Sequence, residues 1–130
     1  MTLNSFQFNT TPGLRFGSGQ AKDACKEISN KLGEHILFVT DKGLMSLGLT
    51  EITLQELKKL GNIEIFDEVE ADPSKKTLLK AIEIGKKIKA TGVVGFGGGS
   101  SMDVAKLAAL ILGSNENLEE AWGVANAKGP

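Results

Sequence analysis

The fold of this chain is decided by the stretch Val93-Val94-Gly95-Phe96-Gly97-Gly98-Gly99-Ser100-Ser101-Met102-Asp103-Val104-Ala105-Lys106. An apolar run leads into a glycine cluster, two serines and a helical pattern that is apolar nearly all round. This order predicts a buried strand, a tight turn and a helix packed between other elements. Glycines let the backbone approach an anion closely, and the first N–H groups of a helix point towards it. The stretch therefore predicts a phosphate site, with close helix–strand packing of the glycines as the alternative.

The composition is that of a single soluble globular domain. Of 130 residues, 41% are hydrophobic and 24% are charged, and the net charge is −1. Because acids and bases are interspersed, neither nucleic acid nor an anionic membrane is an expected partner. The single cysteine cannot form an internal disulfide, and the amino terminus lacks the pattern of a signal peptide. We therefore expect a reducing, cytoplasmic compartment.

The scarcity of metal-ligating and acid–base side chains is equally informative. One histidine, one cysteine and no tyrosine leave little for a transition-metal site or a histidine-based acid–base pair. No catalytic residue and no metal ligand is predicted in this chain. No apolar run reaches the roughly 18 residues that a membrane helix needs.

Strand patterns alternate with helix patterns along the chain, which indicates a mostly parallel, Rossmann-like α/β sheet with helices on both faces. Short segments at residues 6–8 and 14–16, on either side of a Thr-Pro-Gly turn, predict an amino-terminal β-hairpin. Thr53 and Glu56 stand at the spacing of a capping box. The predicted sheet strands are 36–40, 63–66 and 93–96, and the predicted helices are 18–32, 50–60, 78–88 and 101–112, with a further helical turn at 118–122.

Right-handed crossovers in such a sheet place residue 41, residues 67–72 and residues 97–100 along one edge, where ligands bind. The glycine turn is an imperfect dinucleotide fingerprint, because Ser100 stands where the third glycine or alanine belongs. Asp41 directly follows a predicted strand, so its carboxylate can accept hydrogen bonds from both hydroxyls of a ribose and repel a 2′-phosphate. A helix cap or a turn is the alternative for Asp41.

Asp103 and Lys106 are three residues apart on an otherwise apolar helix. That spacing favours an ion pair on the helix surface, and an acid in the first helical turn also suits the helix dipole. The alternative for Lys106 is a contact with a phosphate or with a carbonyl at the sheet edge.

The ten residues 97–106, Gly-Gly-Gly-Ser-Ser-Met-Asp-Val-Ala-Lys, resemble the signature GGGS-x-x-D-x-A-K of the iron-containing (group III) alcohol dehydrogenases. Further segments match that family in order and together span nearly the whole chain. They are Phe16-Gly17-Ser18-Gly19, Val39-Thr40-Asp41-Lys42-Gly43-Leu44, and Phe66-Asp67-Glu68-Val69 leading to Asp72-Pro73-Ser74.

The resemblance implies that residues 1–130 form the dinucleotide-binding domain of a two-domain enzyme. It implies that Asp41 contacts the adenosine ribose of NAD, that the glycine turn binds the pyrophosphate, and that Asp103 lies near the nicotinamide end. Asp72 stands where the family has an amide. The cofactor-binding residues implied in this chain are Asp41, Asp72, Gly97, Gly98, Gly99, Ser100 and Asp103.

The family's activity is hydride transfer between an alcohol and an aldehyde or ketone with NAD(H), assisted by a divalent metal, iron or zinc, that polarises the substrate oxygen. The resemblance places one aspartate and three histidines as metal ligands in a helical domain, and neither they nor the family's loop TTAGTGSE occur in these 130 residues. The chain alone is therefore expected to be inactive and, with the apolar face meant for the helical domain exposed, to self-associate. A nucleotide-binding module without catalysis, or half of an enzyme like glycerol dehydrogenase or maleylacetate reductase, is the alternative.

Overall fold

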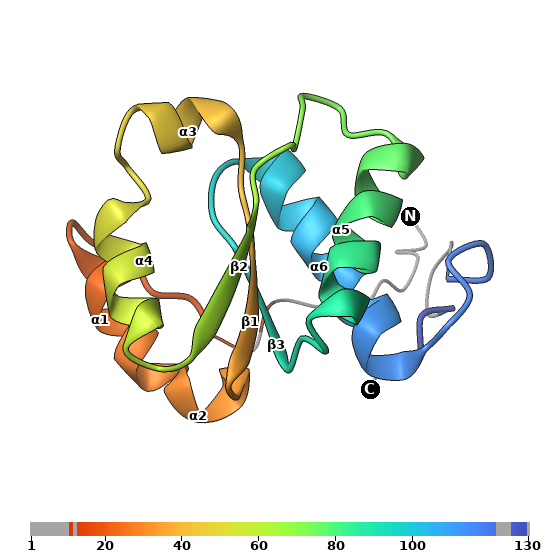
Figure 1. Ribbon diagram of the computed structural model, residues 1–130, viewed down its shortest axis with the longest axis horizontal. Helices are drawn as coiled ribbons and strands as arrows, with labels where there is room; N and C mark the ends of the chain where they lie inside the picture. Colours follow the sequence, from red (N-terminus) through yellow and green to blue (C-terminus); the bar gives the residue numbers. More distant parts are fainter. Residues whose placement is uncertain (1–10, 12, 122–125, 130) are drawn as a thin grey trace, which may run out of the picture.

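The computed structural model describes residues 11, 13–121 and 126–129, and in them the chain forms a parallel sheet with helices on both faces (Figure 1). The sheet order is β2-β1-β3, so the first strand lies in the centre. Val39 stands opposite Phe66 on one side and Gly95 on the other. The predicted parallel α/β architecture is confirmed. Its strands are β1 (His35–Val39), β2 (Asn62–Phe66) and β3 (Gly92–Gly95).

Two layers of helices bury the two faces of the central strand. Figure 1 shows α1 and α4 on one side of the sheet and α5 and α6 on the other. Leu37 and Val39 of β1 belong to the apolar cluster of the α5–α6 layer, whereas Ile36 and Phe38 belong to that of the α1–α4 layer. All four side chains are fully buried, as the continuous apolar run predicts. The helices are α1 (Gln20–Glu27), α2 (Ser29–Leu32), α3 (Lys42–Ser46), α4 (Glu51–Lys58), α5 (Lys75–Lys87) and α6 (Gly99–Ser114).

The predicted amino-terminal hairpin is not confirmed. Residues 14–16, its expected second strand, have no regular secondary structure, and Leu14 and Phe16 are almost fully exposed. A strand needs a neighbour that satisfies its backbone N–H and C=O groups, and no part of the described sheet pairs with these residues. The expected first strand, residues 6–8, lies outside the described residues.

Helix boundaries differ from the predicted ones at several places, and α5 and α6 begin earlier than predicted, at Lys75 and Gly99. The predicted helix 18–32 is divided at Ile28 into α1 and α2. The predicted capping box of Thr53 and Glu56 is wrong, because α4 begins at Glu51 and therefore contains Thr53. Glu56 instead pairs with Lys59 at 2.8 Å, one helical turn further on.

At the amino-terminal ends of the strands, the side chain of Thr91 links the segments that lead into β1 and β3. Its hydroxyl lies 2.8 Å from the carbonyl oxygen of Leu32 and accepts a hydrogen bond from the N–H of His35 at 3.0 Å. At Gly92, a Cβ atom would come within 2.5 Å of the Leu32 carbonyl oxygen, so only glycine allows this approach. The entry to β1 and the entry to β3 are thus held together.

At the carboxyl ends of the strands, by contrast, the chain segments separate. The chain leaves β1 towards β2 on one side and then crosses to β3 on the other side, so the connections diverge above β1 and β3. In open α/β sheets this divergence leaves a crevice that binds ligands. Within the described ranges, no helix combines the length and the apolar character needed to cross a bilayer.

Candidate functional site

Three segments meet above the carboxyl ends of the strands and enclose a cleft of about 450 Å³, here called the carboxyl-edge cleft. It is lined by residues 41–43, 69–71 and 98–101. Beyond the parallel strands β1 and β2, residues 41 and 68 form an isolated antiparallel bridge, in which the N–H of Val69 donates to the carbonyl of Thr40 at 3.3 Å. On the other side, the N–H of Phe96 donates to the carbonyl of Val39 at 2.9 Å. These bonds bring the three segments to one edge, as predicted.

The first turn of α6 supplies hydrogen-bond donors to this cleft. The first backbone bond of the helix runs from Met102 to the carbonyl of Gly98 at 3.1 Å, so the N–H groups of Gly99, Ser100 and Ser101 precede the helical ladder. No side chain caps this end, and among the described residues the Ser100 hydroxyl has no hydrogen-bond partner. A 16-residue helix directs the positive end of its dipole at the same point. The arrangement suits an anion.

The glycines of the turn fall into two classes. A Cβ atom at Gly95 would lie 2.7 Å from the Cβ of Ala105, and one at Gly97 would lie 2.9 Å from a methyl group of Leu44. Gly97 also has φ of +140°, which residues with a side chain disfavour. At Gly98 and Gly99, by contrast, a Cβ atom would meet no atom within 4 Å. Close packing therefore explains Gly95 and Gly97 but not Gly98 and Gly99, whose missing side chains leave the cleft open.

Asp41 also lines the carboxyl-edge cleft. It is the N-cap of α3, and its Oδ1 atom accepts a hydrogen bond from the N–H of Leu44 at 2.9 Å. The predicted helix-cap role of Asp41 is thus confirmed. The side chain is half-buried and lines the cleft, and only Oδ1 is used by the cap. The capping role therefore does not exclude the predicted ligand-binding role of Asp41.

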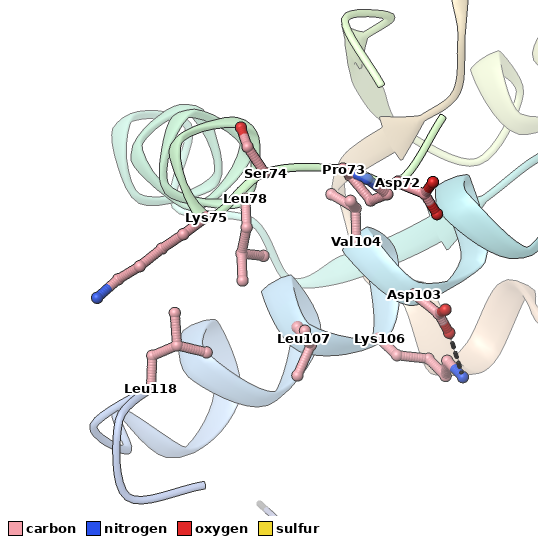
Figure 2. Close-up of a pocket in the computed structure, with 10 residues that line it drawn as sticks. All are labelled: Asp72, Pro73, Ser74, Lys75, Leu78, Asp103, Val104, Lys106, Leu107 and Leu118. Atoms are coloured by element: carbon pink, nitrogen blue, oxygen red, sulfur yellow. Dashed lines mark ion pairs between the residues drawn. The ribbon is translucent and has the colours of Figure 1, made fainter. Parts of the chain in front are cut away.

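Asp72 and Asp103 line a second, neighbouring pocket of about 700 Å³, here called the α5–α6 pocket. Figure 2 shows Leu78, Leu107 and Leu118 converging in its middle, with the two aspartates at one end. The structure therefore places six of the seven predicted cofactor residues in two adjoining hollows. The carboxyl-edge cleft takes Gly98, Gly99, Ser100 and Asp41, with Gly97 packed beneath the turn, and the α5–α6 pocket takes Asp72 and Asp103.

The predicted pairing of Asp103 with Lys106 is confirmed. The Lys106 ammonium group lies 2.8 Å from Oδ1 of Asp103 (dashed in Figure 2). Both side chains are well exposed, so the pair contributes little to stability. Its consequence is local, because it keeps the Lys106 charge beside Asp103 at the rim of the α5–α6 pocket.

Glu70 is a further residue of this edge that no pattern in the sequence marks. Its side chain connects the loop after β2 to the start of α5 through hydrogen bonds. Its carboxylate accepts hydrogen bonds from the N–H of Ser74 at 3.0 Å and from the hydroxyl of Thr77 at 2.6 Å. The Ser74 N–H, followed by the Thr77 hydroxyl, lowers the pKa of Glu70 from 4.5 to about 2. Glu70 therefore stays ionised in all but strong acid.

The low pKa of Glu70 predicts an acid-sensitive contribution to folding. A carboxylate with a depressed pKa stabilises the native state fully above its unfolded pKa of 4.5, and this contribution is lost as the pH falls towards about 2. We expect the difference in melting temperature between the wild type and Glu70→Gln to be largest at neutral pH and to vanish near pH 2. Thermal unfolding followed by circular dichroism at a series of pH values measures this. A difference that is independent of pH would contradict it.

Metal-ligating side chains do not gather in the described part of the chain. Among residues 11, 13–121 and 126–129, no three His, Cys, Asp or Glu side chains lie close enough together to hold a metal ion. The one cysteine, Cys25, is buried in the α1–α4 layer, and burial raises the pKa of its thiol. It is therefore a packing residue, as its place on the apolar helix face predicts.

Comparison with known proteins identifies similarity to one family. The family model described as iron-containing alcohol dehydrogenase matches residues 11–129. Among curated proteins, the sulfoacetaldehyde reductase of Bilophila wadsworthia (strain 3_1_6) is 30% identical over 122 residues, which cover 92% of this chain and 31% of that protein.

Solved structures give the same result. A 1,3-propanediol oxidoreductase superimposes with a TM-score of 0.79 at 26% identity, covering 88% of this chain and 30% of that chain. The sulfoacetaldehyde reductase of Bifidobacterium kashiwanohense, solved in complex with NAD+, superimposes with a TM-score of 0.72 at 25% identity, covering 94% of this chain and 32% of that one. The chain thus spans less than a third of the length of these proteins.

Proposed function

This chain belongs to the iron-containing alcohol dehydrogenase family, and from that premise we propose that its carboxyl-edge cleft binds NAD(H). The chain then serves as the cofactor-binding part of an enzyme that moves a hydride between a small alcohol and the corresponding aldehyde or ketone. Bound NAD(H) supplies the hydride chemistry at its nicotinamide ring. The residues of this chain bind and orient the cofactor.

One observation carries this proposal, namely the open space at Gly98 and Gly99. Nothing within 4 Å of a Cβ atom at either position requires glycine, and the uncapped N–H groups of α6 lie in the same turn. A pyrophosphate that approaches the backbone there would accept from these N–H groups, and a side chain would exclude it. The residues in the cleft therefore fit a dinucleotide.

The other residues of the edge have distinct roles in this proposal. The carboxylate of Asp41 accepts hydrogen bonds from the adenosine ribose hydroxyls and repels a 2′-phosphate, which favours NAD over NADP. Ser100 donates its hydroxyl to a phosphate oxygen. Asp72 and Asp103, which line the adjoining α5–α6 pocket, face the nicotinamide half of the cofactor.

Isothermal titration calorimetry of the chain with NAD+ tests the proposal directly. We expect saturable binding of one NAD+ per chain and competition by ADP, which carries the adenosine and diphosphate portions alone. A chain that stays folded but takes up neither ligand would contradict the proposal.

Hydride transfer by the chain alone is not expected, even with Fe²⁺ or Zn²⁺ added. The described residues contain no cluster that fits the family's metal, so no step through a metal is assigned to them. Mixing the chain with NAD+, either metal and a series of small alcohols should leave the NADH absorbance at the level of the buffer control. Turnover that disappears in a variant unable to bind NAD+ would overturn this expectation.

A further inference from the structure

The loop between β2 and α5 forms a wall shared by the two hollows of the site. Residues 69–71 line the carboxyl-edge cleft, and residues 72–74 line the α5–α6 pocket. Figure 2 shows Asp72 and Pro73 where the chain enters α5, close to the first turns of α6. Any shift of this loop would therefore move the side chain of Asp72 relative to both hollows.

The backbone at Asp72 adopts a conformation that is uncommon for residues with a Cβ atom, although aspartate adopts it more readily than most. Its φ is +50°, in the left-handed region. The following residue is Pro73, whose ring further restricts the conformation of the residue before it. Such a backbone persists only where surrounding contacts hold it.

Glu70 supplies those contacts from two residues before Asp72. Its Oε1 atom accepts from the N–H of Ser74 at 3.0 Å and from the Thr77 hydroxyl at 2.6 Å, while its Oε2 atom lies 2.8 Å from the same hydroxyl. Ser74 is itself tied to the helix, because its Oγ atom accepts from the N–H of Thr77 at 3.2 Å. The carboxylate thus closes a ring around residues 71–73 and fixes both ends of the segment that carries Asp72.

We propose that Glu70 is a positioning residue that holds Asp72 in the orientation needed to meet the nicotinamide half of a bound dinucleotide. The inference rests on the proposed NAD site. A cap for α5 is the competing account of Glu70, because an acid near a helix amino terminus stabilises the helix by itself. The two accounts differ in which part of the cofactor they affect.

ADP and NAD+ separate these accounts, because ADP lacks the nicotinamide half. Glu70→Ala removes a negative charge beside the cleft, which does not weaken binding of a diphosphate. We expect Glu70→Ala to lower NAD+ affinity about tenfold, as loss of a correctly held polar group does, and to leave ADP affinity within about twofold of the wild type. The conservative Glu70→Gln keeps an oxygen at the Oε1 position, so its NAD+ affinity should stay within about twofold of the wild type.

A double-mutant cycle tests whether Glu70 acts through Asp72. In an Asp72→Ala background, Glu70→Ala should cause no further loss of NAD+ affinity, because the group that it positions is gone. Glu68→Gln is the matched control, since Glu68 is an exposed acid of the same loop that pairs with Lys80 at 2.7 Å and lines neither hollow. Thr77→Val, which removes the hydroxyl from the ring, provides a second route if Glu70→Ala fails to fold, and it should also weaken NAD+ more than ADP.

The outcomes distinguish this inference from the proposal on which it rests. Calorimetry that finds NAD+ and ADP weakened equally, or losses in Glu70→Ala and Asp72→Ala that add fully, would overturn the positioning role and leave the NAD site intact. A Glu70→Gln variant as impaired as Glu70→Ala would also overturn it, because charge and not geometry would then matter. A folded wild-type chain that binds neither nucleotide would overturn both.

Discussion

Gly99→Val is expected to abolish NAD+ binding while the chain stays folded. The Cβ atom and methyl groups of valine would occupy the space that is open in front of the first turn of α6, where the pyrophosphate is proposed to lie. The loss should exceed about a hundredfold, since phosphate contacts with backbone N–H groups permit no intervening side chain. The free energy of unfolding should change by no more than about 1 kcal/mol, because Gly99 is the first residue of its helix and touches no neighbour there.

Two other glycines make this experiment specific. Gly13→Val is the matched control, because a Cβ atom there also meets nothing within 4 Å but the residue lines neither hollow. Gly95→Val is the opposite case, because its Cβ atom would press against Ala105, and it should unfold the chain at a lower temperature. Calorimetry with NAD+ and thermal melting of all three variants give the comparison. Undiminished NAD+ affinity in folded Gly99→Val would mean that the open space has no part in binding.

Asp41→Ser should shift cofactor preference from NAD+ towards NADP+, changing the ratio of the two affinities on the order of tenfold to a hundredfold. The variant removes the negative charge that would repel a 2′-phosphate. Serine is chosen because the Asp41 carboxylate also caps α3 through the N–H of Leu44, and a serine hydroxyl keeps that cap. Asp41→Gly should shift the ratio in the same direction, with a small further loss of stability from the missing cap.

The measurement is the pair of dissociation constants for NAD+ and NADP+ in each protein. Asp67→Asn is a suitable control, since Asp67 directly follows β2 at the same edge of the sheet but lines neither hollow. An unchanged affinity ratio in Asp41→Ser would leave Asp41 with its capping role alone.

The parallel sheet can be predicted from the sequence because its determinants are local. β1 is a continuous apolar run that is buried on both faces, as its composition requires, and β2 alternates polar and apolar residues before a polar loop. The helix α3 cannot be predicted in the same way, because five residues (Lys-Gly-Leu-Met-Ser) are too few to reveal a helical period. Its formation depends on the Asp41 cap and on the tertiary contacts of the folded chain, and not on intrinsic propensity.

The position of the candidate site can be predicted from the sequence, but the separate roles of its residues cannot. The glycine turn and Asp41 follow strand ends, and parallel topology alone brings such ends to one edge. The two classes of glycine cannot be told apart in the sequence, because packing at Gly95 and openness at Gly99 depend on residues distant in the chain or on their absence. Glu70 is hidden for a related reason. Its partner Thr77 is seven residues away across a loop, a spacing that no periodic pattern marks.

The hydroxyl of Thr91, which joins the entries to β1 and β3, has a consequence for selection experiments on this chain. In a library screened only for folded protein, substitutions at Thr91 and Gly92 would be lost, because both residues pack against backbone. Substitutions at Gly98 and Gly99 would be tolerated in that screen. In a library screened for dinucleotide binding, substitutions at all four positions would be lost. Positions that are sensitive only in the binding screen would then be those of the carboxyl edge, so binding residues can be separated from folding residues without a bound complex.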